Sequence, residues 1–220
     1  MLTAAPGVLS VLVDVQRRLE SLYALEPETP VTEFLVAQDA VEAQPQGSRT
    51  LVAQDGDELR VGVVIDGEVR EGVARSDPRV RLDASNLAAL CTLTEEVSHF
   101  LYVLFCARCG RSVTQLELEL QGEVDKYLTA VSLLSVQNEG AVSRRLRDLL
   151  FRGYRLRENL AGESAERYRE ASRLAWTYCG YLESAFLRRA RLLDLRREAR
   201  RFYRLGQQDK LLKIGTLHTA

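Results

Sequence analysis

One predominantly apolar stretch, Val97 to Ala107 (VSHFLYVLFCA), most strongly limits what this chain can fold into. Nearly every residue in it is apolar, so a helix built from it has no polar side to leave in water. Such a helix has to be buried on all sides by the rest of the chain. We therefore expect it to lie at the centre of the core, within a helical hairpin that runs from Ser85 to Leu134.

The sequence also predicts where this hairpin turns. Gly110 can end the first helix in a left-handed conformation, which glycine adopts without steric cost. Thr114 and Glu117 have the spacing of a capping box, the usual start of a new helix. Apolar residues then recur at helical spacing as far as Leu134. Two long antiparallel helices that turn at Cys109-Gly110-Arg111 are the expected result.

The part of the chain before this hairpin has a different character. All five prolines lie in the first 78 residues, and proline is excluded from helix interiors. Apolar residues at helical spacing predict one amphipathic helix between Val8 and Leu22, which ends before Pro27. Three short stretches rich in β-forming residues follow, at 34–37, 50–54 and 58–65. The dipeptides Asp55-Gly56 and Asp66-Gly67 are typical of tight hairpin turns.

The part after the hairpin is expected to be entirely helical. A short basic helix is predicted at 141–152, and a long one at 164–205 that only Gly180 interrupts. The sequence therefore predicts an α+β protein that is predominantly helical. A small N-terminal module of one helix and an antiparallel sheet (1–82) precedes a C-terminal bundle of four to five helices (83–220).

A group of polar residues falls inside the predicted core hairpin. Glu96 and His99 lie three residues apart and share one helix face. His99 is about 12 residues from the turn, or roughly 18 Å along the helix, which places Glu123 at the same height on the partner helix. Glu119 lies one helical turn from Glu123. We expect Glu96, His99, Glu119 and Glu123 to converge in a polar core cluster.

This cluster has two interpretations. Carboxylates with a Glu-x-x-His pair are half of the ligand set of di-iron helical bundles. The second Glu-x-x-His is missing, and the other histidine, His218, lies two residues from the C-terminus. A mononuclear metal site remains an alternative. We favour a structural role, in which a buried His99 is bonded to a carboxylate of its own hairpin, Glu123 or Glu96.

The cysteines favour no redox or zinc chemistry. Cys106 and Cys109 form a Cys-x-x-Cys at the end of a helix, whereas reactive pairs lie at a helix N-terminus. Cys91 is about four turns away on the same helix, so it cannot complete a zinc site with them. We expect four free thiols, mainly as small core residues, in a reducing compartment. The chain also has no P-loop, no dinucleotide-binding glycine motif and no HExxH.

The charge is divided unevenly along the chain. Residues 141–220 contain 19 Lys and Arg against 9 Asp and Glu, a net charge of +10, and residues 1–140 contain 11 against 22, a net charge of −11. Such asymmetry indicates either an internal contact or a charged partner. The predicted partner-binding residues are basic residues of the last helices: Arg188, Arg189, Arg196, Arg197, Arg200, Arg201, Arg204 and Lys210.

Together these patterns favour a non-catalytic interaction protein of the bacterial cytoplasm, an adaptor or accessory subunit that binds an acidic protein partner. No cofactor and no membrane insertion are expected, and a homo-oligomer stays open. One alternative is a metal-dependent enzyme that uses the Glu96/His99/Glu123 cluster. A second is a nucleic-acid-binding accessory protein, because Phe202 and Tyr203 lie among the arginines and could stack on bases.

Overall fold

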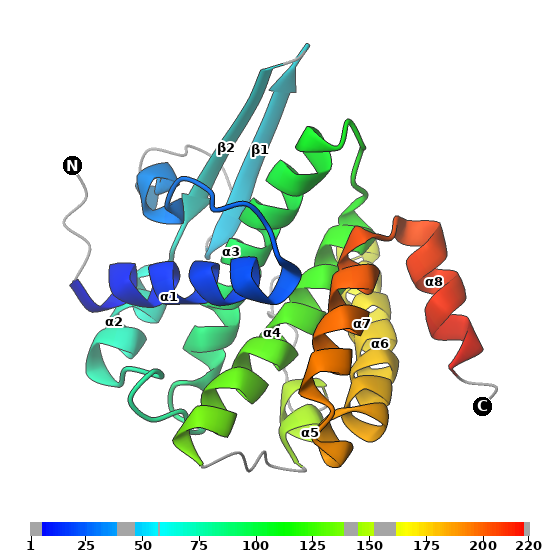
Figure 1. Ribbon diagram of the computed structural model, residues 1–220. Coiled ribbons are helices and arrows are strands. Elements are labelled where there is room, and N and C mark those ends of the chain that lie inside the picture. Colours follow the sequence, from blue (N-terminus) through cyan, green and yellow to red (C-terminus); the bar gives the residue numbers. More distant parts are fainter. Residues whose placement is uncertain (1–5, 39–46, 57, 139–144, 152–161, 218–220) are drawn as a thin grey trace.

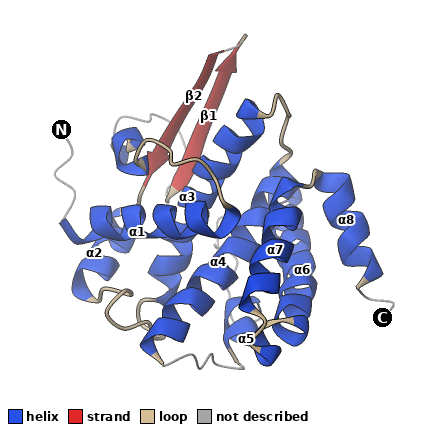
Figure 2. Ribbon diagram, viewed as in Figure 1, coloured by secondary structure: helices blue, strands red, loops and turns tan. Residues whose placement is uncertain are grey.

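A computed structural model gives the structure of the protein and describes residues 6–38, 47–56, 58–138, 145–151 and 162–217. A helix and a two-stranded antiparallel sheet precede a C-terminal region of helices (Figure 1). The predicted α+β fold with a helical majority is confirmed. Figure 2 shows the two strands, which form the one sheet among the described residues, with one end beside α3 (Leu87–Arg108) and the other end projecting beyond the helices.

The predicted helical hairpin lies at the centre of the molecule as α3 (Leu87–Arg108) and α4 (Gln115–Gln137). Phe100 is fully buried, as expected for an apolar helix enclosed by others. Gly110 adopts the left-handed conformation with φ of +60°. The Thr114 hydroxyl accepts a hydrogen bond from the Glu117 backbone N–H at 3.1 Å, so the predicted start of α4 is also confirmed.

The N-terminal module is built from α1 (Pro6–Tyr23), the 3₁₀ helix η1 (Val31–Phe34), β1 (Arg49–Asp55), β2 (Glu58–Val64) and α2 (Gly67–Arg75). The strands β1 and β2 pair from Arg49 opposite Val64 to Asp55 opposite Glu58, and Gly56 in the turn has φ of +57°. Helix α1 lies across the α3–α4 hairpin (Figure 1).

Two predictions for this module are wrong. Residues 34–37 form no strand, because η1 ends at Phe34 and the residues after it are not part of a sheet. Leu35 alone forms an isolated β-bridge, with Val63 of β2. Asp66-Gly67 forms no hairpin turn, because the Asp66 carboxylate accepts the backbone N–H of Glu68 and caps α2. Aspartate followed by glycine suits a turn and a helix start equally, so sequence alone does not separate them.

The C-terminal region consists of α5 (Leu146–Phe151), α6 (Gly162–Ala185), the 3₁₀ helix η3 (Leu187–Arg189), α7 (Leu192–Arg204) and α8 (Gln207–Thr216). The prediction of one helix at 164–205 is wrong: the helix continues through Gly180 and the chain reverses after Ala185. Ala190 takes the positive φ of 51° in this reversal. For the helix predicted at 141–152, residues 141–144 and 152 lie outside the described residues.

The reversal places α7 against α6 and α1, and thereby unites the core. The Phe202 ring stacks on Tyr178 of α6 at 3.8 Å between centroids, and Tyr203 stacks on Tyr23 of α1 at 4.0 Å. One cluster of buried apolar residues extends from Val8 to Ile214. The N-terminal module and the bundle therefore share a core, and the boundary at residue 82 stays a prediction.

Helix α3 is long and apolar enough to cross a membrane, judged by length and composition. Most of its apolar residues are nevertheless buried inside the protein, against α1, α4 and the strands. This is the environment of a core helix.

Candidate functional site

The polar core cluster lies where α3 and α4 face each other. His99 is buried, and its Nε2 atom lies 3.8 Å from Oε2 of Glu119. Glu95 completes the group, and the potential ligand atoms of Glu95, His99 and Glu119 all lie within 4.8 Å of one another. We call these three residues the Glu-His cluster. The expected burial of His99 beside a carboxylate of its own hairpin is confirmed, but this carboxylate is Glu119 rather than Glu96 or Glu123.

The structure separates Glu96 from the cluster. Its Oε2 atom accepts a hydrogen bond from the Thr50 hydroxyl of β1 at 2.9 Å, so this buried carboxylate holds the sheet against α3. The expectation that Glu96 converges on His99 is therefore corrected. Positions three and four residues before His99 both share its helix face. Because β1 packs against the side of α3 that carries Glu96, Glu95 is the carboxylate that lies beside His99.

Glu123 meets the cluster through a lysine that the sequence analysis did not select. The Lys126 ammonium donates to Glu123 Oε1 at 2.6 Å and to Glu95 Oε2 at 3.1 Å. The hydroxyl of Tyr168, on α6, lies 3.5 Å from Glu95 Oε1. Lys126 is the first lysine of the chain, because every Lys or Arg position before it is an arginine. This rarity is the one feature of the sequence that could have drawn attention to Lys126.

Burial sets the electrostatics of the cluster. It raises the pKa of Glu119 to about 8, and the nearby charge of Glu95 adds to the effect. Burial also raises the pKa of Glu123, against the opposing effect of Lys126. Carboxylates removed from water are stabilised by cations and hydrogen bonds, which Lys126 and Tyr168 provide in part.

A second buried polar network lies at the same height on the hairpin, on another side of α3 and α4. Asp125 accepts hydrogen bonds from the Ser98 hydroxyl at 2.6 Å, from Gln121 Nε2 at 2.9 Å and from the Tyr23 hydroxyl. The Lys210 ammonium donates to Gln121 Oε1 at 2.8 Å, so α8 is tied to this network. These contacts join α1, α3, α4 and α8 through side chains that are buried and hydrogen-bonded.

The basic helices contribute fewer surface charges than expected. Lys210 is fully buried, and burial lowers its pKa to about 7, so its predicted role in partner binding is corrected to a role in the core. Arg200 donates to the backbone carbonyls of Leu22 and Ser21 and thereby holds the end of α1. Exposed guanidinium groups remain on Arg188, Arg189, Arg196, Arg197, Arg201 and Arg204.

The arginines of α7 do not cover every side of the helix. Leu195, Ala199, Phe202 and Tyr203 form a buried stripe that packs on α1 and α6. The charged residues therefore lie on the outward side, as in an ordinary amphipathic helix. Because Phe202 and Tyr203 are buried, they are not available to stack on nucleic-acid bases.

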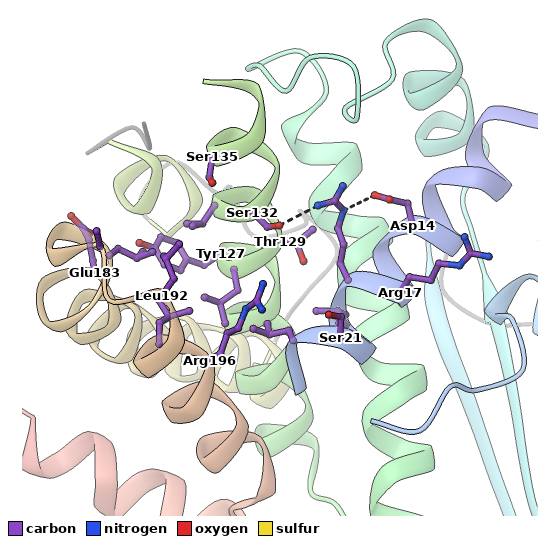
Figure 3. A pocket seen from close by; sticks show the side chains of 18 of the residues that line it. Asp14, Arg17, Ser21, Tyr127, Thr129, Ser132, Ser135, Glu183, Leu192 and Arg196 are labelled. Carbon is purple, nitrogen blue, oxygen red and sulfur yellow. Dashed lines mark hydrogen bonds and ion pairs between the residues drawn. The ribbon is translucent and has the colours of Figure 1, made fainter. Parts of the chain in front are cut away.

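A cleft of about 880 Å³ opens between α1, α4 and the start of α7 (Figure 3). We call it the α1–α7 cleft. Apolar side chains that line it come from all three helices and from η3: Leu19, Leu22, Leu128, Val131, Leu187, Leu192 and Leu195. Hydroxyl groups of Tyr127, Thr129, Ser132 and Ser135 are interspersed among them along α4. Its volume is within the range of ligand-binding sites.

Charged groups surround this cleft unequally. Arg18 is paired with Asp14 at 2.6 Å and also donates to Ser132, and Arg188 is paired with Glu183 at 2.6 Å. Figure 3 shows Arg196 reaching from α7 toward the other lining side chains. In the part of the chain that the structure describes, its guanidinium makes no ion pair, so it is available to an external anion.

The cysteines show no sign of activation. All four are unbridged, and three are buried, whereas Cys109 is exposed at the end of α3. Burial raises the pKa of Cys106 to about 11, against the opposing charge of Arg111, so this thiol stays protonated at neutral pH. The interpretation of Cys106 as a small core residue agrees with this environment, and that of Cys109 does not.

Two features can therefore act chemically: the Glu-His cluster, whose oxygen and nitrogen atoms can hold a cation, and the α1–α7 cleft, which can hold an anionic and partly apolar molecule. Neither feature has a sequence motif that names a reaction. Comparisons with protein-family models, with curated proteins and with solved structures found no match to this chain.

Proposed function

We propose that this protein is a non-catalytic adaptor or accessory subunit of the bacterial cytoplasm that binds an acidic, amphipathic segment of a protein partner in the α1–α7 cleft. The observation that carries this proposal is an apolar cleft beside an exposed arginine, Arg196, that makes no ion pair within the described residues. An apolar floor with a charged rim is the usual anatomy of a peptide-binding groove.

A protein segment suits the surface next to the cleft better than a small molecule does. Leu192 and Leu193 begin α7 with exposed fractions of 56% and 71%. Leu192 lines the cleft, and Leu193 extends the apolar surface beyond it. A ligand confined to the cleft would leave Leu193 in water, whereas an amphipathic helix could cover both leucines.

The charges favour an acidic partner. The two carboxylates at the cleft, Asp14 and Glu183, are already paired with arginines, so the remaining charge is positive. Further exposed arginines on α7 extend this positive surface along the helix. Complementary charges of this kind accelerate association and fix the orientation of the partner. Nucleic acid is the less suitable anion, since the aromatic residues of α7 are buried.

The experiment compares two doubly substituted proteins. Arg196→Glu with Leu192→Asp changes the cleft, and Arg60→Glu on β2 with Leu212→Asp makes the same chemical changes at exposed positions outside the cleft and outside the arginine-rich face of α7. The probe is a fluorescent amphipathic peptide of leucine and glutamate, and its fluorescence anisotropy measures binding. We expect the cleft variant to bind at least about tenfold more weakly, while the matched variant binds as the wild type does.

Two further probes separate the alternatives. A peptide with the same leucines but lysine in place of glutamate should not bind, and binding of the acidic peptide should weaken as salt is added. A short DNA duplex tests the nucleic-acid alternative. Binding of the duplex but not of the acidic peptide would overturn the proposal, as would equal affinities of the two variants.

A further inference from the structure

A second candidate site lies in the core, apart from the cleft, where α3 and α4 face each other. Its three members, Glu95, His99 and Glu119, offer two carboxylate oxygens and one imidazole nitrogen. All three are buried, with exposed fractions of 5%, 6% and 9%. Exposed acidic groups often come together without a ligand, but burial of two ionised carboxylates and a histidine costs solvation energy, which protonation, hydrogen bonds or a cation can offset.

The distances match a metal ion. Two ligand atoms that each lie about 2.1 Å from an ion can be no more than about 4.2 Å apart. His99 Nε2 and Glu119 Oε2, at 3.8 Å, already satisfy this limit. No separation within the cluster is larger than 4.8 Å, at most about 0.6 Å beyond this limit, which a small rotation of a glutamate side chain can supply.

A glycine makes room for this arrangement. Gly122 lies in the buried interior of α4, where glycine is less favourable than alanine by about 1 kcal/mol. A Cβ atom at this position would lie 3.1 Å from His99 Nε2 and 3.6 Å from Glu95 Cγ. The nitrogen that would ligate the ion is thus the atom that a larger residue would crowd.

Neighbouring residues contact both carboxylate oxygens of Glu95. Lys126 binds Oε2 of Glu95, and the Tyr168 hydroxyl approaches Oε1 of the same carboxylate from α6. Contacts of this kind orient metal ligands in protein sites. They leave Glu119 Oε2 and His99 Nε2 facing each other at the centre of the cluster.

We propose that Glu95, His99 and Glu119 bind one divalent transition-metal ion, of the type of Mn²⁺, Fe²⁺ or Zn²⁺, that joins α3 to α4. A mixed set of carboxylate and imidazole ligands is typical of these ions, whereas Mg²⁺ and Ca²⁺ prefer oxygen alone. Three protein ligands also leave a coordination position for water. The ion stabilises the hairpin because it binds the folded chain, in which the three ligands converge.

The test uses the full-length protein without an affinity tag. The protein is treated with a chelator, equilibrated with Zn²⁺ or Mn²⁺ and freed of excess ion, and bound metal is measured by elemental mass spectrometry. We expect one equivalent of metal and a higher melting temperature than without metal. Glu119→Gln, which keeps the size of the side chain, should weaken metal binding by at least tenfold, and His99→Ala should abolish it.

Three variants keep the result interpretable. Glu96→Gln changes the adjacent buried glutamate, which contacts Thr50, and should keep the metal; His218→Ala removes the other histidine and should also keep it. Gly122→Ala should weaken binding by crowding His99. The proposal is overturned if the wild type binds no metal, if Glu96→Gln loses as much as Glu119→Gln, or if His218→Ala removes the metal. Circular dichroism shows whether each variant is folded. If His99→Ala does not fold, the metal content of Glu119→Gln decides between the outcomes.

Discussion

Two buried tyrosines, Tyr23 and Tyr203, stack on each other but place their hydroxyl groups in different environments. The Tyr23 hydroxyl donates to Asp125 and accepts from Gln121 Nε2, whereas the Tyr203 hydroxyl has no hydrogen-bond partner among the described residues. Tyr23→Phe should lower the free energy of unfolding by about 1 to 3 kcal/mol, because it leaves buried polar partners unsatisfied. Tyr203→Phe should leave it unchanged or raise it. Urea denaturation measures both, and equal losses would contradict the assigned network.

Buried Lys210 should make the stability of the protein depend on pH. Burial lowers its pKa from 10.5 to about 7, so between these values the unfolded chain carries a proton that the folded chain lacks. The free energy of unfolding that this residue contributes therefore rises with pH, by up to about 1.4 kcal/mol per pH unit. Below about pH 7 both states are protonated, and the cost of burying the ammonium group is present in full.

The comparison with Lys210→Met isolates this effect, since other titrating groups are common to both proteins. Buried tyrosines such as Tyr102, whose pKa burial raises, act in the opposite direction only at higher pH. From about pH 7.5 to 9, wild type should gain roughly 1 to 2 kcal/mol relative to the variant in denaturant titrations. A constant difference across this range would show that Lys210 keeps its charge in the folded protein.

Among the helices, Arg200 of α7 acts as a cap for α1. Its Nε donates to the Leu22 carbonyl at 2.8 Å and its Nη2 to the Ser21 carbonyl at 3.1 Å. Carbonyls of a last helical turn lack partners within the helix, and a positive charge there is favourable. Arg200→Ala should destabilise the protein by about 1 kcal/mol. Arg197→Ala is the matched control: its side chain is 77% exposed and paired only with Asp194, so its melting temperature should barely change.

Local sequence signals predicted some helices of this fold and missed others. Periodicity, the Thr114 cap and Gly110 predicted the α3–α4 hairpin, because such signals act within one or two turns of chain. The reversal at Ala190 had no signal of this kind, since α7 turns back to pack Phe202 on Tyr178, far apart in sequence. Likewise, helical spacing placed a carboxylate beside His99 but could not choose between Glu95 and Glu96. That choice depends on Thr50, which approaches from β1.

Across the whole molecule, the basic residues of the C-terminal segment lie both in the core and on the surface. The basic C-terminal segment sends Lys210 into the polar network of Asp125 and Gln121 and Arg200 to the end of α1. Arg196 and its exposed neighbours stay outside. The two explanations considered for the asymmetry, an internal contact and an external partner, thus concern different residues and do not exclude each other.

We expect the N-terminal module and the bundle to unfold together, because they share one core. Leu12 of α1 is completely buried in a core that also contains residues of α3, α4, α6 and α7. Leu12→Ala should lower the free energy of unfolding by about 2 to 5 kcal/mol. Trp176, the one tryptophan of the chain, lies on α6 and reports on the bundle.

If the shared core makes unfolding cooperative, the Trp176 fluorescence transition of the Leu12→Ala variant should shift as far as the transition seen by far-ultraviolet circular dichroism. Val52→Ala on β1, where the side chain is 49% exposed, is the control and should shift neither transition appreciably. An unchanged Trp176 transition in Leu12→Ala would mean that residues 83–220 unfold as an independent domain. In that case residue 82 would separate two units that unfold independently, as well as two parts of different composition.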